Sequence, residues 1–118
     1  MTLAVETDMA SKLAVCQLNE RIAPRFDQCP ELVLVTLDTS GAAKEKKVLP
    51  IANLKPQEVA DLLSRLDVTT LICGGVKEES QQALKKFNIA LIDNVIGDVQ
   101  DVLIRYSKGK LSRGNTVQ

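Results

Sequence analysis

The sequence predicts a single α/β domain in which helices cover a five-stranded mixed sheet in three layers. The 118 residues are enough for one hydrophobic core and too few for two. Hydrophobic residues make up 45% of the chain and charged residues 25%, which is ordinary for a globular protein. Short β-type runs fill the first half, and the second half alternates helical spacing of apolar residues with short strands.

The first half of the chain is predicted to form three strands joined by one long loop. Residues 12–18 (KLAVCQL) are an apolar run of the length of a buried strand. Residues 19–30 carry two prolines and mixed charges, which predicts a loop. Residues 31–38 (ELVLVTLD) are rich in β-branched side chains and predict the second strand. A turn then leads to a third, antiparallel strand over residues 47–51, and Pro50 favours a position at the sheet edge.

The second half of the chain is predicted to alternate helices and strands. A helix, a strand, a helix, a strand and a helix are expected at residues 56–66, 68–73, 77–87, 89–92 and 98–109. Pro56 suits the first turn of a helix, because its missing N–H would have no partner there. Asp98 is expected to cap the last helix and Gly109 to end it. Each strand–helix–strand connection should be right-handed.

The two ends of the chain are predicted to flank the domain. We expect residues 1–11 to be a flexible extension, residues 12–111 to form the domain, and residues 112–118 to be a flexible tail. The start of the chain has no basic leader followed by an apolar stretch, so we expect no signal peptide. No apolar run approaches the ~20 residues that span a bilayer. These features predict a cytoplasmic protein whose thiols stay reduced.

The charge pattern argues against nucleic acid or a membrane as a partner. The 15 basic residues balance the 15 acidic ones, so no global field attracts phosphate groups. Aromatic residues are only 3% of the chain, which leaves few stacking platforms for single strands. The short basic run at residues 44–47 (KEKK) is predicted to be a solvated hairpin loop rather than a binding patch.

Two stretches of the chain resemble the dinitrogenase iron–molybdenum cofactor biosynthesis family. Residues 22–38 (IAPRFDQCPELVLVTLD) are similar to the family's loop "hFGxAxxF" and the strand that follows it, with Phe26 at the phenylalanine. Further matches follow between residues 72 and 111, at Gly74, Gly75, Ala83, Leu84, Asn88, Ile89, Gly97, Tyr106, Gly109 and Leu111. The resemblance covers about residues 12–111. Arg25 stands where the family commonly has a histidine, and the chain contains no histidine, so no imidazole ligand carries over.

The resemblance implies a fold and a role. Together with the order of elements, it implies the ribonuclease H-like topology with strand order 3-2-1-4-5. It also implies a non-enzymatic carrier whose cargo is an iron–sulfur or iron–molybdenum type cluster or its precursor, with a link to nitrogen fixation. Cluster-assembly or acceptor proteins would then be its partners.

Three cysteines are the candidate metal ligands. Cys16 lies near the end of the first strand, Cys73 ends the fourth, and Cys29 precedes the second. In the expected strand order these positions meet at one edge of the sheet, where α/β sheets tend to bind ligands. Thiolates are soft ligands suited to iron–sulfur clusters, Cu(I) or zinc. Cys16 and Cys73 could equally be small hydrophobic residues of the core, whereas Cys29 in its loop is expected to be the most exposed thiol.

Glycine and arginine residues form a second candidate site near the same edge. Gly74 and Gly75 precede a helix, so their backbone N–H groups could hold an anion, or they could simply form a tight turn. Arg21 and Arg25 in the long loop could add positive charge, and Phe26 completes the candidate cofactor-binding set. Either arginine could instead be solvated.

Other function classes fit the sequence less well. A nuclease of this topology needs several carboxylates on the sheet to hold two metal ions, and neither residues 12–18 nor residues 69–73 contain any. The sequence contains no dinucleotide-binding or P-loop motif, and without histidine no catalytic triad can form. A cofactor-free interaction or regulatory module remains an open alternative to the carrier.

Overall fold

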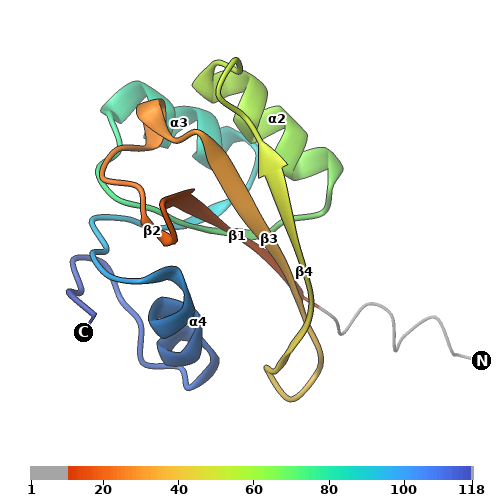
Figure 1. The fold of residues 1–118 in the computed structure, drawn as a ribbon. Helices are drawn as coiled ribbons and strands as arrows, with labels where there is room; N and C mark the ends of the chain where they lie inside the picture. The colour runs from red at the N-terminus through yellow and green to blue at the C-terminus, as the bar shows by residue number, and fades with distance from the viewer. Residues whose placement is uncertain (1–10, 118) are drawn as a thin grey trace, which may run out of the picture.

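A mixed β-sheet forms the middle layer of the protein in a computed structural model that describes residues 11–117 (Figure 1). Its strands in chain order are β1 (Ser11–Leu18), β2 (Arg21–Ile22), β3 (Glu31–Leu37), β4 (Ala43–Pro50), β5 (Thr70–Ile72) and β6 (Ala90–Ile92). Hydrogen bonds join them in the order β4–β3–β1–β5–β6, and β2 pairs with β1 beside this path. The β1–β5 and β5–β6 pairs are parallel, whereas β3 runs antiparallel to β1 and β4. All five expected strands are present, and β2 is an addition within the expected loop.

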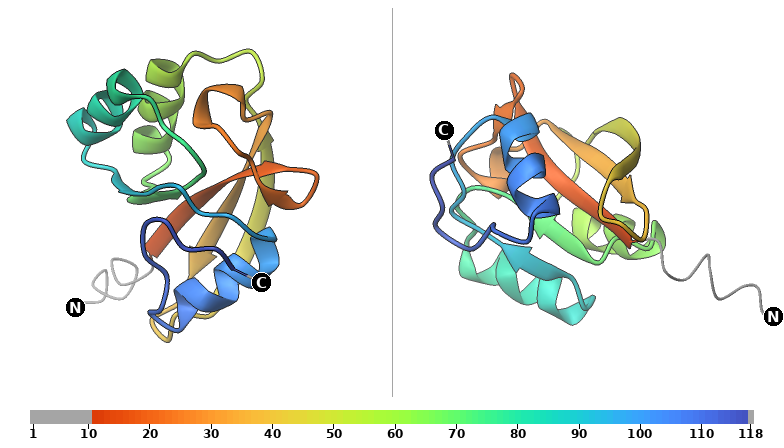
Figure 2. Two further views of the ribbon diagram at one scale, coloured as in Figure 1. Left: turned by 90° about the vertical axis from the view of Figure 1, so that its left-hand side faces the viewer. Right: turned by 90° about the horizontal axis from the view of Figure 1, so that it is seen from below.

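Helices cover both faces of this sheet, as expected. The helices α2 (Pro56–Arg65) and α3 (Glu78–Lys86) lie on one face and α4 (Val99–Ser107) on the other, which Figure 2 shows from two further sides. A short 3₁₀ turn, η1 (Phe26–Gln28), precedes β3. Within residues 11–117, no helix is both long and apolar enough to cross a membrane.

The two faces of the sheet have separate hydrophobic cores because side chains alternate along each strand. On β1, Ala14 and Cys16 point to α2 and α3, whereas Leu13 and Val15 point to α4. We call these the two-helix face and the α4 face. Both cores are closed to solvent: Cys16 and Val15, neighbours on opposite faces, each have 0% exposure.

Strand β4, predicted as the third strand at residues 47–51, begins earlier than the sequence indicated. Residues 44–47, expected in a hairpin loop, lie within β4, where they are exposed at the sheet edge. Lysine and glutamate have low strand propensity, but pairing with the strongly β-branched β3 extends them. The prediction of a loop here is therefore wrong, while the edge position expected from Pro50 is confirmed.

The chain after α4 packs against the domain in this structure. Residues 112–117, expected to be a flexible tail, run beside the segment after β6 and pair with it at Ile96 and Thr116. Val117 N–H donates to the Ile96 carbonyl at 2.7 Å, and Ile96 N–H donates to the Asn115 carbonyl at 2.9 Å. Val117 is buried in the α4-face core. Of the expected N-terminal extension, residues 1–10 lie outside the described residues, and Ser11 begins β1.

Candidate functional site

The three cysteines converge on the two-helix face, as their positions in the predicted sheet indicated. Cys16 lies in β1 opposite Leu32 of β3, and Cys73 directly follows β5. Since Val15 pairs with Ile72 in parallel register, the next residue on each strand is a cysteine. Cys29 follows η1 and joins the same core as the other two. Three separate elements therefore bring their thiols together.

The three thiols lie in one buried cluster, and their proximity affects the pKa of Cys16 and that of Cys29. Burial raises the pKa of Cys16 well above its ordinary value, and the neighbouring Cys29 and Cys73 thiols raise it further. The neighbouring Cys16 thiol lowers the pKa of Cys29, although burial opposes this effect. The Cys29 thiol itself lies 2.8 Å from the Glu31 carbonyl oxygen, to which it donates. Cys16 thus keeps its proton.

All three cysteines are buried, which corrects one expectation. Cys16 and Cys73 have 0% exposure and Cys29 has 5%, so Cys29 is not an exposed loop thiol. The loop curls inward at η1, and Phe26 enters the two-helix core beside it. Cys29 nevertheless borders a surface cavity of about 120 Å³ between η1, the segment after β4 and the start of α2. Of the three, Cys29 is the thiol that lines this cavity.

The loop before β3 is tied over the thiols by the glycine pair. Phe26 N–H donates to the Gly75 carbonyl at 2.8 Å, and Gly75 N–H donates to the Pro24 carbonyl at 2.7 Å. A Cβ atom on Gly74 would lie 2.3 Å from the Pro24 oxygen and 2.4 Å from the Ala23 oxygen. Only glycine fits at Gly74, because the two backbones are in direct contact there. We call residues 23–29 the cover loop.

This arrangement uses a backbone group that the anion-site alternative at the glycine pair would need. Helix α3 begins at Glu78 with Lys77 as its N-cap, so the glycines do not form the helix start. The N–H group of Gly75 is already used by Pro24 and cannot bind a ligand in this conformation. Gly74 and Gly75 act as the seat of the cover loop, which is the tight-turn alternative in a more specific form.

The two arginines of the candidate set lie in different places. Arg25 sits on the cover loop and pairs with Asp27 at 3.1 Å, where Lys77 also approaches at 3.3 Å. The hydrogen bond from Arg25 lowers the pKa of Asp27. Arg21 instead pairs with Asp98 of the α4 side at 2.8 Å. Arg25 therefore lies near the thiols and Arg21 does not.

Asp98 occupies the expected N-cap position of α4 without capping it. Its side chain makes no hydrogen bond to the first turn and is paired with Arg21 instead. The backbones of these two residues also form a β-bridge. The ion pair therefore joins the β1–β2 hairpin to the start of α4 rather than forming part of a ligand site.

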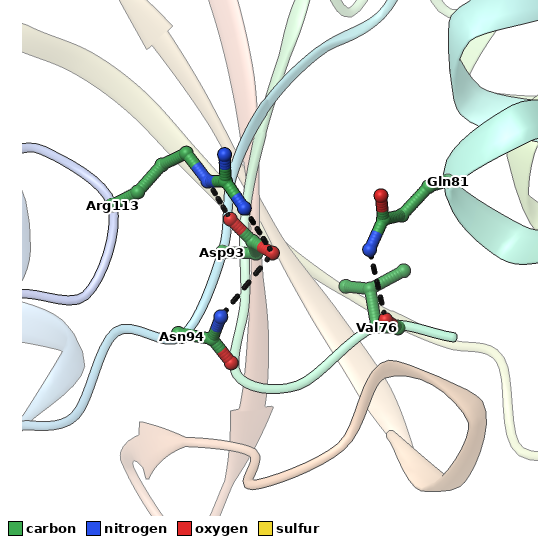
Figure 3. Close-up of polar contacts among 5 residues, drawn as sticks. All are labelled: Val76, Gln81, Asp93, Asn94 and Arg113. Carbon is green, nitrogen blue, oxygen red and sulfur yellow. Dashed lines mark hydrogen bonds and ion pairs between the residues drawn. The ribbon is translucent and has the colours of Figure 1, made fainter. Parts of the chain in front are cut away.

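A buried ion pair between Asp93 and Arg113 was not anticipated from the sequence. Asp93 follows β6, and its side chain is 2% exposed, whereas that of Arg113 is 69% exposed. Arg113 holds both carboxylate oxygens of Asp93, one through Nε and the other through Nη2 at 3.3 Å (Figure 3). The Asn94 amide also donates to Asp93, at 3.4 Å. The hydrogen bond to Asp93 raises the pKa of Arg113. An acidic residue directly after a predicted strand was the available signal.

No preformed metal site is present among residues 11–117. No group of three cysteine, aspartate, glutamate or histidine side chains in this part of the chain is arranged to hold a metal ion. The three thiols lie among core residues instead. Their use as ligands requires a change in the cover loop.

Comparisons with known proteins agree with the fold. The family model described as dinitrogenase iron-molybdenum cofactor matches residues 9–109. No curated protein matches the sequence. Among solved structures, PH0822 superposes with a TM-score of 0.79 at 14% identity, over 86% of this chain and 93% of that one.

Two further structures are similar in the same way. The apo form of the orange protein from Desulfovibrio gigas has a TM-score of 0.68 at 18% identity, over 92% of this chain and 96% of its own. A candidate dinitrogenase, MJ0327 from Methanocaldococcus jannaschii, has a TM-score of 0.70 at 22% identity, over 86% and 91%. These likenesses show a shared fold. Because the family model spans most of the sequence, this chain belongs to the dinitrogenase iron–molybdenum cofactor family.

Proposed function

We propose that this protein is a non-enzymatic carrier of an iron–sulfur or iron–molybdenum type cluster or of its precursor. The observation that carries the proposal is the meeting of three thiols, from three separate elements, beneath one loop at the edge of the sheet. Membership in the cofactor family supports the choice of cargo. The strand order supports our assignment of the fold to the ribonuclease H-like class.

The cover loop would control access to the thiols. Two backbone hydrogen bonds, between Phe26 and Gly75 and between Gly75 and Pro24, hold it closed together with the buried ring of Phe26. Each such bond contributes only about 1 kcal/mol net, so an open state is within reach of a cargo that gains thiolate bonds. When the loop opens, Cys29 moves with it, and Cys16 and Cys73 become accessible from the same side. Closing would return the thiols to the core and release the cargo.

Charge near the cover loop supports recognition of an anionic cluster. Arg25 and Lys77 both contact Asp27, so two cations share one carboxylate. These two cations lie beside the glycine seat of the loop, and Glu78 and Glu79 in the first turn of α3 oppose their effect. Cluster-assembly or acceptor proteins would exchange cargo at this edge, in a cytoplasm that keeps the three thiols reduced.

The burial of the thiols favours a second candidate function. A cofactor-free interaction module of the same fold needs no accessible thiol, and exposures of 0% to 5% are ordinary for core cysteines. This candidate predicts that replacing all three cysteines with serine or alanine leaves folding and partner binding intact.

Anaerobic reconstitution tests the carrier. Reduced protein would be incubated with iron and sulfide, with molybdate in a parallel sample, and metal content and thiolate charge-transfer bands would be measured. We expect stoichiometric uptake by the wild type and its loss in Cys16→Ser, Cys29→Ser or Cys73→Ser. Val15→Ala is the matched control, because it removes buried volume beside Cys16 on the opposite face and leaves every thiol in place.

The outcomes separate the two candidates. Uptake that is retained in Val15→Ala and lost in a cysteine variant supports the carrier and identifies its ligands. A folded wild type that takes up no metal or cluster overturns the carrier and favours the cofactor-free module.

A further inference from the structure

We propose that Cys29 and Cys16 form a hydroperoxide-reactive pair, in which Cys29 meets the oxidant and Cys16 closes a disulfide with it. The inference goes beyond cluster carriage, since it requires only the thiols of the metal-free protein. Its basis is a cavity beside Cys29, the position of both cysteines in one buried cluster and the different exposure of the two residues.

A small cavity lies beside Cys29. It measures about 120 Å³ and is lined by the apolar residues Phe26, Ile51 and Val59, with polar groups of Asp27 and Gln28 at its rim. A water molecule occupies about 30 Å³ in the liquid, so a molecule the size of hydrogen peroxide has room. A small hydroperoxide therefore fits the site.

The proximity of Cys16 and Cys29 is the second observation. Both residues belong to the same buried cluster. The Cys29 thiol donates to the carbonyl of Glu31, and Glu31 pairs across the sheet with Gln17, the residue after Cys16, so a sulfur that is oxidised at Cys29 has a second thiol nearby. Cys16 is wholly buried and does not line the cavity. Oxidant that enters the cavity consequently meets Cys29 first.

The backbone allows the two residues to approach further. Cys16 lies on β1 in the middle of the sheet, whereas Cys29 lies between η1 and β3, outside the ladder. The cover loop is joined to β1 at the same level, where Ala23 N–H donates to the Cys16 carbonyl at 3.0 Å. Small movements of a loop residue next to a fixed strand residue can reach the geometry that a disulfide requires.

The reaction has two balanced steps. The Cys29 sulfur attacks one peroxide oxygen and the O–O bond breaks, which gives a sulfenic acid at Cys29 and releases an alcohol, or water from hydrogen peroxide. The Cys16 sulfur then attacks the Cys29 sulfur and displaces the hydroxyl as water, with the Cys16 proton leaving on it. In sum, two thiols and one hydroperoxide give one disulfide, one alcohol and one water. A dithiol reductant reverses the oxidation by thiol–disulfide exchange.

Cys73 provides the internal comparison. It follows the register partner of Val15 and so lies beside Cys16, but it is 0% exposed and does not line the cavity. An oxidant that reached the thiols at random would not distinguish Cys29 from Cys73. The structure assigns the first oxidation to Cys29 because it is the one of the three cysteines that lines the cavity.

The test uses the full chain, reduced and treated with a chelator to remove metal, with less than one equivalent of hydrogen peroxide. Free thiols would be counted with time and the linked residues mapped by peptide mass spectrometry. We expect a monomer that has lost two hydrogen atoms and carries a Cys16–Cys29 disulfide. Cys73→Ser should react at the wild-type rate, whereas Cys29→Ser should react at least about tenfold more slowly. Cys16→Ser should stop at a sulfenic acid that dimedone traps on Cys29.

Other results would overturn the inference. They are a Cys16–Cys73 or intermolecular disulfide in the wild type, or Cys29→Ser oxidised as fast as wild type. Circular dichroism would verify that each variant is folded, and the mapping on wild type needs no variant at all. Because no metal is present, failure here leaves the reconstitution test of cluster carriage untouched, and the reverse also holds.

Discussion

The hydrophobic cores on the two faces of the sheet contain different types of side chain. The two-helix core contains all three cysteines and the ring of Phe26, whereas every buried residue of the α4 core is valine, leucine or isoleucine. Each face also has its own cover at the carboxyl ends of the parallel strands. The cover loop closes the first, and residues 112–117 close the second through the Asp93–Arg113 pair.

This difference indicates that the two faces have different roles. Aliphatic side chains on the α4 face can only pack, so that face supplies stability. Thiols on the two-helix face can bind metal or be oxidised, and they are shielded by a loop held through few bonds. Changes on the two faces should therefore have separable effects, which four experiments can test.

Gly74→Ala should have the largest effect, because a Cβ atom there would lie 2.3 Å from the Pro24 oxygen. We expect a loss of about 3 kcal/mol in the free energy of unfolding, measured with urea, and faster reaction of the thiols with a small alkylating reagent. Gly75→Ala is the matched control, because a Cβ atom there would lie 3.5 Å from the Pro24 oxygen, an ordinary van der Waals contact. Equal losses in the two variants would show that the cover loop does not depend on this contact.

Val15→Ala should have the next largest effect, on stability alone. The side chain is fully buried on the α4 face, and removing two methyl groups costs about 2 kcal/mol. Thermal or urea unfolding measures the loss. The rate of thiol oxidation in the folded protein should stay at the wild-type value, and a rate that rises as in Gly74→Ala would mean that the faces are coupled.

Arg113→Ala should have a smaller effect, because its guanidinium is largely solvated. The change leaves the buried Asp93 carboxylate without its main partner, so we expect a lower Tm by differential scanning calorimetry. Adding Asp93→Asn should recover part of the loss, since the remaining group is then uncharged. Lys110→Ala, an exposed neighbour before the same segment, is the control. Equal effects of the Arg113 and Lys110 changes would exclude a role for the ion pair.

The raised pKa of Cys16 should make the free energy of unfolding fall at alkaline pH and leave it unchanged near neutrality. The pKa of Cys16 is raised above its ordinary value of 9.0 in the folded state. As the pH rises through 9.0, the unfolded chain releases this proton and the folded chain retains it, so stability falls. The slope is at most about 1.4 kcal/mol per pH unit and ends where the folded thiol ionises.

Unfolding of wild type and Cys16→Ala at about pH 8 and about pH 10 measures this dependence. The alanine variant should lose less stability between the two conditions. Parallel losses would mean that Cys16 ionises as easily in the folded protein as in the unfolded chain.

The elements of the fold were predictable because most of them follow local rules. Periodicity located the three helices, and Pro56 and Gly109 mark the first turn of α2 and the end of α4. Gly109 has a φ of 69°, as expected for the residue that ends a helix. The convergence of the thiols followed from strand order and register, which the residue pairs of the sheet reproduce.

What failed depended on tertiary contacts. Residues 44–47 have no local preference for a strand, and β3 imposes one on them. The tail around Arg113 reads as polar and flexible, yet its arginine finds a buried carboxylate 20 residues away. The burial of Cys29 depends on the position of Phe26 in the core, and no periodic pattern in the sequence predicts that position.

The exposed strand β4 has a consequence for how the protein behaves at high concentration. Among residues 11–117 it lies at the edge of the sheet with no strand on its outer side, and Lys44, Lys46 and Lys47 lie along it. Like charges oppose the pairing of two such edges, so these lysines keep neighbouring copies from joining into a continuous sheet. Acetylation of the same lysines would remove that repulsion while leaving the fold intact. Colloidal stability of this protein is therefore open to control by a modification far from its thiols.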